Sequence, residues 1–269
     1  MINIKNEYEK NGYFIIKNII NKVEIIKLKK IISTLQPRLM VPYSHEAWGY
    51  GNCLYADGFE VISKNNKILN AVNRILCDDF EFNHLMVNRK PPWIGPEVEY
   101  HQEIFNSKTF APGASVDELK KKWCQIYIPL DSETSSNGGL RVVTNSHSLG
   151  MLESEDIINQ NYSHKRRVPV SVLNKITNSN ECNLLDLDLQ AGDCVFFSPL
   201  LIHGSPSNGT GSERISLVLQ SKIKYFKPNN KIFENEVLYR NSFLTQLLSE
   251  KIDEINRGNK YSDFKLTKK

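Results

Sequence analysis

Two histidines and one glutamate are the residues of this sequence best suited to binding a metal. His101 and Glu103 lie two positions apart, and His203 follows much later in the chain. A β-strand presents positions i and i+2 on one face, so a strand over this segment would display His101 and Glu103 together. Two imidazoles and one carboxylate form the facial triad that holds Fe(II) while leaving coordination positions open.

A cation follows the third of these residues at a short spacing. Val195 to His203 is rich in β-forming residues, positions 204–213 are crowded with Gly, Ser, Pro and Asn, and Arg214 to Gln220 alternates again. The pattern predicts an antiparallel hairpin with a long polar connection, in which His203 closes the first strand and Arg214 opens the second. A metal ligand and a guanidinium would then lie together at one end of a sheet.

This pairing suits an anion that binds a metal at one end and a guanidinium at the other. Iron(II) needs an electron source to activate oxygen, and a 2-oxo acid chelates iron through its keto and carboxylate oxygens. Its far carboxylate would pair with Arg214, and Ser205 and Ser216 could add hydroxyl donors.

The elements that would position these residues are helices first and strands afterwards. Asn21 and Glu24 form a capping box at the start of a helix whose apolar face includes Leu28 and Ile32, and Lys67 to Leu76 is a second amphipathic helix. The expected strands are an apolar strand within Tyr8 to Ile20, a strand with Phe82, His84, Met86 and Asn88 on one face, Val98 to Phe105, Trp123 to Leu130, and a short strand at Arg141 to Val143.

Two stretches show no clear period. His45 to Gly58 is aromatic and glycine-rich and is predicted to be a loop, and residues 153–185 are polar and are predicted to be a lid-like insertion. The organisation expected is one domain over 1–269: helices in 1–80, a β core at about 81–224, and a helical segment in 225–269. Helices followed by many short strands favour a mainly β fold, a barrel or jelly roll with flanking helices.

Composition excludes several classes of protein. The chain has 269 residues, 40% of them hydrophobic, and a formal net charge of +4 spread along its length. Nucleic-acid binding would require a denser basic stripe. A membrane span would require about eighteen consecutive apolar residues, which are absent. The five cysteines form no CxxC, which is typical of a reducing compartment, and we expect a cytoplasmic location.

Several stretches together resemble the phytanoyl-CoA dioxygenase family of iron(II)/2-oxoglutarate oxygenases. They are YHQEIF, NGGLRVVTNSH, AGDCVFFSPLLIHGS, the arginine eleven residues after its histidine, MVNRKPP and NGYFIIKNII, and they cover most of Tyr8 to Ile223. The resemblance implies a double-stranded β-helix (jelly roll, cupin-like) that uses Fe(II), O2 and 2-oxoglutarate. The roles it implies are iron binding by His101, Glu103 and His203, binding of the distal 2-oxoglutarate carboxylate by Arg214 and Ser205, and lining of the cosubstrate by Met86 and Tyr127, with Gln125 as a further candidate.

Other polar residues receive weaker assignments. Arg141 and Asn88 are candidates for contacts with the prime substrate, and His84 and His147 are interpreted as structural. Two positions depart from the family pattern: Glu103 stands where Asp is usual, and Asn145 replaces the glycine before Ser-His. A carboxylate at the ligand position disfavours halogenation, because halogenases of this type have a small residue there.

The resulting hypothesis is an enzyme that hydroxylates an unactivated C–H bond of a small metabolite while 2-oxoglutarate is converted to succinate. Desaturation or cyclisation would need only a different fate of the substrate radical. The alternatives are a catalytically silent jelly-roll binding protein and a hydrolase or isomerase that uses another metal. Arg214 has no obvious function in a hydrolase or isomerase, so replacing it distinguishes that class from a 2-oxoglutarate-dependent oxygenase.

Overall fold

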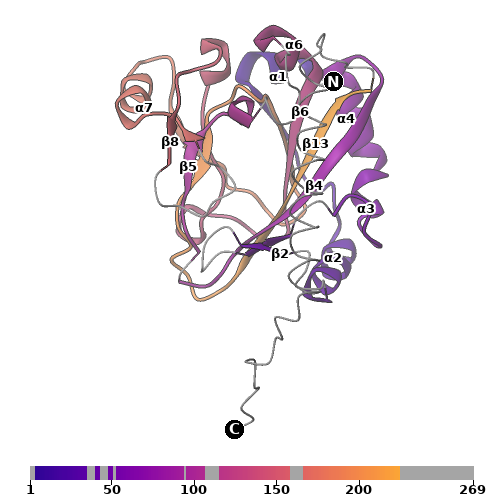
Figure 1. The fold of residues 1–269 in the computed structure, drawn as a ribbon. Helices are drawn as coiled ribbons and strands as arrows, with labels where there is room; N and C mark the ends of the chain where they lie inside the picture. The colour runs from indigo at the N-terminus through magenta and orange to yellow at the C-terminus, as the bar shows by residue number, and fades with distance from the viewer. Residues whose placement is uncertain are drawn as a thin grey trace, which may run out of the picture.

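Two antiparallel sheets face each other across the molecule, and helices cover the outer side of the larger one (Figure 1). The computed structural model describes residues 4–34, 40–42, 48–50, 53–93, 95–106, 115–157 and 166–224. This arrangement is the mainly β jelly roll that the order of elements predicted.

The larger sheet has seven strands in the order β1-β11-β6-β13-β4-β3-β2. Their bounds are β1 Tyr13–Ile16, β11 Cys194–Phe197, β6 Trp123–Pro129, β13 Arg214–Ile223, β4 Phe80–Lys90, β3 Trp48–Tyr50 and β2 Met40–Pro42. The long strand β13 lies between β4 and β6 and pairs with both.

The smaller sheet has four strands in the order β10-β7-β12-β5. They are β10 Leu184–Asp186, β7 Arg141–Val143, β12 His203–Ser205 and β5 Val98–His101. A separate two-stranded ribbon pairs β8 (Glu155–Asp156) with β9 (Arg166–Arg167). The α-helices are α1 Ile4–Asn11, α2 Lys22–Thr34, α3 Glu60–Ser63, α4 Asn66–Leu76, α6 Val116–Lys122 and α7 Val170–Thr177, and the 3-10 helices are η2 Glu103–Asn106, η3 Ser135–Asn137 and η4 Ser146–Leu149.

The hydrophobic core lies between the larger sheet and the helices α1 to α4. Leu28 of α2 and Val72 of α4 pack in one cluster with strand residues such as Leu85, Ile126 and Leu217, all fully buried. Side chains alternate along a strand, so the neighbours of these residues point to the opposite face of the sheet. The helices therefore occupy the outer face and leave the inner face for the polar side chains that the sequence places there.

Local signals predicted the helices well. The Asn21 side chain accepts hydrogen bonds from the backbone N–H groups of Val23 and Glu24, and the Glu24 carboxylate accepts one from the Asn21 N–H. The capping box is therefore confirmed. The second amphipathic helix is confirmed as α4, and the side chain of Asn65 caps its first turn.

The predicted shared face of β4 is wrong at one residue. Gln220 of β13 pairs with His84, but the next residue, Ser221, pairs with Phe82, so Asn83 is an extra residue in β4 at this point of the register. An extra residue of this kind is a β-bulge, and it reverses the side-chain alternation beyond it. Phe82 accordingly packs against the helix-side core with Leu85, whereas Met86 and Asn88 point inward.

The prediction that His203 and Arg214 lie on the two strands of one hairpin is also wrong. The apolar run breaks after β11, and the chain crosses over residues 198–202 to the smaller sheet before β12 begins at His203. Arg214 opens β13 as predicted, but in the larger sheet. The two residues still meet, because the sheets face each other across one cavity.

Parts of the two aperiodic stretches are strands. β3 lies within the predicted loop 45–58, and β10 lies at the end of the predicted insertion 153–185 and pairs with β7 in the smaller sheet. The predicted C-terminal helical segment lies outside the described residues. None of the five cysteines forms a disulfide in the described structure, and all but Cys77 are buried. No helix in the described part of the chain is long and apolar enough to cross a membrane.

Candidate metal centre

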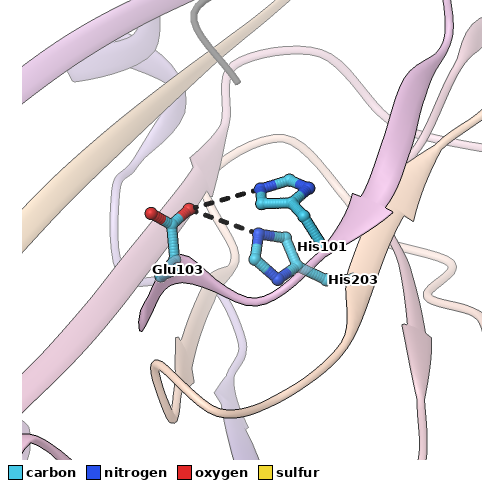
Figure 2. A group of neighbouring side chains, drawn as sticks. All are labelled: His101, Glu103 and His203. Atoms are coloured by element: carbon cyan, nitrogen blue, oxygen red, sulfur yellow. Dashed lines mark ion pairs between the residues drawn. The ribbon is translucent and has the colours of Figure 1, made fainter. Parts of the chain in front are cut away.

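The two candidate histidines are direct cross-strand neighbours in the smaller sheet. His203 of β12 pairs with His101 of β5, and their ring centroids lie 4.3 Å apart (Figure 2). Both residues are buried. The sheet register therefore brings together two imidazoles that are far apart in the sequence.

Backbone carbonyls fix the tautomer of both rings. His101 Nδ1 lies 2.7 Å from the carbonyl oxygen of Glu99, and His203 Nδ1 lies 3.0 Å from that of Leu201. A carbonyl oxygen only accepts, so each Nδ1 carries the proton and donates it. Each Nε2 then presents a lone pair, which is the form that binds a metal. Burial, followed by the neighbouring His101, lowers the pKa of His203, which favours this neutral ring.

Glu103 reaches the histidines from a 3-10 helix and not from the predicted strand. β5 ends at His101, and η2 begins at Glu103. Between them, the buried Gln102 donates from Nε2 to the carbonyls of Leu200 and Gly150, and its Oε1 accepts from the Leu152 N–H. These three bonds fix the turn that aims the Glu103 carboxylate at the two rings (Figure 2).

The three ligand atoms converge on one point. Glu103 Oε1 lies 3.3 Å from His203 Nε2 and 3.7 Å from His101 Nε2, and one ligand atom from each of the three residues lies within 4.8 Å of the others. These separations match three donors on one face of a metal ion with N and O ligand distances near 2 Å. The donor set, two neutral imidazoles and one carboxylate, fits non-haem Fe(II).

Arg214 lies in the cavity wall and is already anchored. Its Nη1 donates to the Tyr127 hydroxyl (2.8 Å) and to Ser216 Oγ (2.7 Å), and its Nη2 donates to the Gly138 carbonyl (2.9 Å). The buried Glu133 carboxylate lies 3.4 Å from Nη1 and accepts from the Tyr127 hydroxyl at 2.6 Å. Arg214 Nε is buried without a hydrogen-bond partner among the described residues. The Nε edge of the guanidinium can therefore donate a hydrogen bond to a ligand.

A second basic side chain, Lys90, lies beside Arg214. The Lys90 side chain is buried, and its Nζ donates to Ser205 Oγ at 2.7 Å and to the Pro206 carbonyl. Burial, with the charge of Arg214 as the next cause, lowers the pKa of Lys90 from 10.5 to about 6. Glu133 and Glu97 oppose this shift, but Glu133 already pairs with Arg214.

A cavity of about 100 Å³ connects the metal triad to Arg214 and Lys90. One water needs roughly 10–15 Å³ by this kind of measure, so the space suits a small organic ligand. The predicted residues that line it are His101, Glu103, His203, Arg214, Ser205, Tyr127, Met86 and Asn88.

Three predicted residues lie elsewhere. Arg141 is not among the residues that line the cavity: its Nε donates to Asp186 on the neighbouring strand β10 at 2.5 Å, and its role as a substrate contact stays a prediction. Gln125 shares its strand face with Tyr127 but is not among the residues that line this cavity. His147 is buried and bonds through Nε2 to the Glu9 carbonyl at 2.9 Å, consistent with a structural role.

Sequence reasoning missed Lys90, Glu133 and Gln102. Lys90 could have been found, because alternation along the strand places it on the same face as Asn88. Glu133 and Gln102 gave no such signal, because each depends on a partner far along the chain, Arg214 for Glu133 and Leu200 for Gln102.

A jelly roll that holds two histidines and a carboxylate beside a buried arginine defines a class of protein, the non-haem iron oxygenases that use a 2-oxo acid. The sequence profile described as "Phytanoyl-CoA dioxygenase (PhyH)" matches residues 8–216. The chain belongs to this family.

Solved structures share the fold at low sequence identity. The epimerase SnoN, solved in complex with Fe3+, alpha ketoglutarate and nogalamycin RO, is 14% identical, with 82% of each chain covered and a TM-score of 0.64. EctD from S. alaskensis, solved with 2-oxoglutarate and 5-hydroxyectoine, is 18% identical, with 81% of this chain and 74% of that chain covered and a TM-score of 0.63. HygX from Streptomyces hygroscopicus, solved with nickel, 2-oxoglutarate and hygromycin B, is 10% identical, with 84% and 88% covered and a TM-score of 0.61. No curated protein matches the chain.

Proposed function

We propose that this protein uses Fe(II), O2 and 2-oxoglutarate to hydroxylate an unactivated C–H bond of a small metabolite. One observation carries the proposal: a triad of two histidines and a carboxylate and a buried pair of basic side chains, Arg214 and Lys90, line the same cavity. A metal centre at one end and positive charge at the other suit a dicarboxylic 2-oxo acid.

Iron bound by His101, Glu103 and His203 would supply oxygen activation, with the 2-oxo acid as the source of electrons. The protein's part is to hold the three ligands on one face and keep the opposite coordination positions open. The carbonyls that accept from both Nδ1–H groups keep the rings oriented, and Gln102 keeps the Glu103 turn in place.

The distal carboxylate of 2-oxoglutarate would bind between Arg214 and Lys90. The Nε edge of Arg214 can present a bidentate fork, and Lys90 with Ser205 adds an ammonium and a hydroxyl. Glu133 and Tyr127 position the guanidinium before the ligand arrives, which reduces the entropy lost on binding. Met86 lines the same space.

The type of reaction and the substrate are inferred more indirectly. SnoN is named as an epimerase and SnoK as a carbocyclase, so this fold accommodates outcomes other than hydroxylation. Hydroxylation needs no residue beyond those that hold metal and cosubstrate, and it is the outcome we propose. A small-molecule substrate is supported by the small cavity and by the nogalamycin and hygromycin B ligands of two neighbours.

An anaerobic titration tests the first half of the proposal. Iron(II)-loaded protein is titrated with 2-oxoglutarate while the visible metal-to-ligand charge-transfer band is recorded, with His203→Ala as the matched variant. A band in the wild type alone supports the chelate. Bound iron with no band in the wild type refutes the proposal and favours a binding or hydrolytic role.

The nature of the reaction requires product analysis. Once a substrate is found by screening for stimulated succinate formation, a mass increase of one oxygen supports hydroxylation, and a loss of two hydrogens identifies desaturation or cyclisation. A metal-dependent hydrolase would instead act without O2 or 2-oxoglutarate and would tolerate Arg214→Ala.

A further inference from the structure

A second group of polar side chains lies on the inner face of the larger sheet, one row beyond the cavity. In register across strands β11, β6, β13 and β4 are Phe197, Gln125, Gln220 and His84. Their neighbours two positions along the last three strands, Tyr127, Val218 and Met86, line the cavity. Positions i and i+2 share a face, so the row continues the same inner surface.

Both ends of this row approach the metal triad. The Phe197 ring centroid lies 4.8 Å from that of His203. At the other end, burial lowers the pKa of His84 and is the largest influence on it. The charge of the Glu103 carboxylate acts in the opposite direction and raises this pKa. The two glutamines lie between these ends in the register of the sheet.

The two glutamines lack the hydrogen bonds that buried amides normally make. Gln125 is 0% exposed, and neither its Oε1 nor its Nε2 has a partner among the described residues. Gln220 is 4% exposed, and its Oε1 likewise has none there. Buried polar groups are nearly always paired, and an unpaired one costs about 1–3 kcal/mol. Gln102, equally buried, bonds through both ends of its amide.

The row is also distinct from the cosubstrate end of the cavity. Gln220 lies six residues along β13 from Arg214, which corresponds to about 20 Å at the usual rise of a strand. A small dicarboxylate held at Arg214 cannot also reach Gln220. The metal triad lies against the stretch between them, where Val218 lines the cavity.

We propose that the carboxamides of Gln125 and Gln220 recognise an uncharged polar group of the prime substrate, a hydroxyl or a carboxamide. This proposal rests on the proposed function and deepens it by naming the substrate class. Gln125 offers both a donor and an acceptor, which a hydroxyl or an amide complements. A carboxylate is disfavoured there, because a buried charge needs a partner of opposite charge and neither glutamine is cationic.

The distinguishing variants are Gln125→Met and Gln220→Met, which keep the length of the side chain and remove its polar atoms. Replacing an unpaired buried amide with an apolar group costs little or stabilises, whereas removing a paired one leaves its partners unsatisfied. Gln125→Met is expected to keep or raise the melting temperature, and Gln102→Met is expected to lower it. A fall in Gln125→Met as large as in Gln102→Met would overturn the proposal, since Gln125 would then be a structural residue.

The binding test uses three five-carbon probes with the anaerobic Fe(II)- and 2-oxoglutarate-loaded protein: pentanamide, pentan-1-ol and pentanoate. Affinities come from ligand-observed NMR. We expect wild type to bind pentanamide or pentan-1-ol about 10-fold more tightly than pentanoate, and Gln125→Met to lose this preference. Equal ratios in the two proteins, or tighter binding of pentanoate by wild type, would overturn the proposal.

The two proposals fail in different ways. A missing 2-oxoglutarate charge-transfer band in the wild type counts against the oxygenase function itself. A normal band together with an unchanged probe preference in Gln125→Met counts against the glutamine site alone.

Discussion

Lys90 carries a buried amine whose replacement should stabilise the ligand-free protein. Its pKa falls from 10.5 to about 6 on folding, because burial and Arg214 disfavour the charge while Glu133 and Glu97 compensate only in part. At pH 7 the unfolded chain holds the proton and the folded protein releases it. Releasing this proton costs the folded state about 5 kcal/mol, because pH 7 lies about 3.5 units below the unfolded pKa of 10.5 and each unit corresponds to about 1.36 kcal/mol.

The sign of the pH dependence follows from the same shift. Between pH 6 and pH 10.5 the unfolded state binds more protons than the folded state, so stability rises with pH across this window. Lys90→Met removes the penalty, and its gain in the free energy of unfolding is greatest below pH 6 and disappears above pH 10.5. Allowing for the lost bond to Ser205, we expect roughly 2–5 kcal/mol at pH 7, or a rise of roughly 5–15 °C in melting temperature.

The same substitution should weaken cosubstrate binding. A carboxylate beside Lys90 restores its charge, so wild type is expected to take up nearly one proton when it binds 2-oxoglutarate at pH 7.5. Losing one charge-assisted bond of about 1.5–3 kcal/mol weakens binding about 10- to 100-fold. Binding of 2-oxopentanoate, which has the same chelating end and no distal carboxylate, should change little.

Anaerobic titration calorimetry of the Fe(II)-loaded protein, in two buffers with different ionisation enthalpies, measures affinity and proton uptake together. Lys222→Met is the matched control, since Lys222 pairs with Glu81 at the far end of β13, and it should leave both quantities unchanged. The reasoning is refuted if Lys90→Met loses stability, or if it binds 2-oxoglutarate like the wild type.

Other residues of the site give three further expectations. Arg214→Met should lower 2-oxoglutarate affinity by at least about 100-fold in calorimetry. It should also destabilise the fold by about 3–5 kcal/mol in urea unfolding, because Glu133 is left as a buried unpaired charge. The double variant with Glu133→Gln should recover much of the stability but not the affinity, and recovery of both would contradict the assigned role of Arg214. Glu103→Ala should reduce iron affinity by two orders of magnitude or more in an equilibrium chelator competition, whereas Glu103→Asp should retain measurable binding; similar affinities in all three proteins would remove Glu103 from the ligand set. Arg141→Ala breaks a partly exposed ion pair with Asp186 and should change the free energy of unfolding by at most about 1 kcal/mol and leave 2-oxoglutarate affinity intact; a large loss of affinity would restore Arg141 to the site.

Residue type and alternation predicted much of the site. His101, His203 and Arg214 were identified because few residues offer their chemistry and because turn residues mark the ends of their strands. The alternation of side chains along a strand predicted that Gln125 and Tyr127 share one face of β6.

Features that depend on distant partners could not be predicted in this way. Glu103 lies beside the two histidines but on a 3-10 helix in place of the expected strand, since the turn that aims it depends on bonds from Gln102 to Leu200 and Gly150. The bulge at Asn83 has no glycine or proline to mark it, so Phe82 was placed on the wrong face. Glu133 lies on a turn whose sequence gives no hint that it folds against Arg214.

Strand β13 links the two ends of the cavity as one covalent segment. It is hydrogen-bonded to β4 along nearly its whole length and to β6 along most of it, so it cannot stretch or slide by one residue without breaking both ladders and turning every side chain over. The separation between Arg214 and Gln220 is therefore a fixed length. In the proposed enzyme the metal would lie between these two residues, so the carbon that is oxidised would depend on how many bonds separate it from the substrate group that the glutamines bind. Homologous substrates lengthened by one carbon should then react at the neighbouring position along the chain.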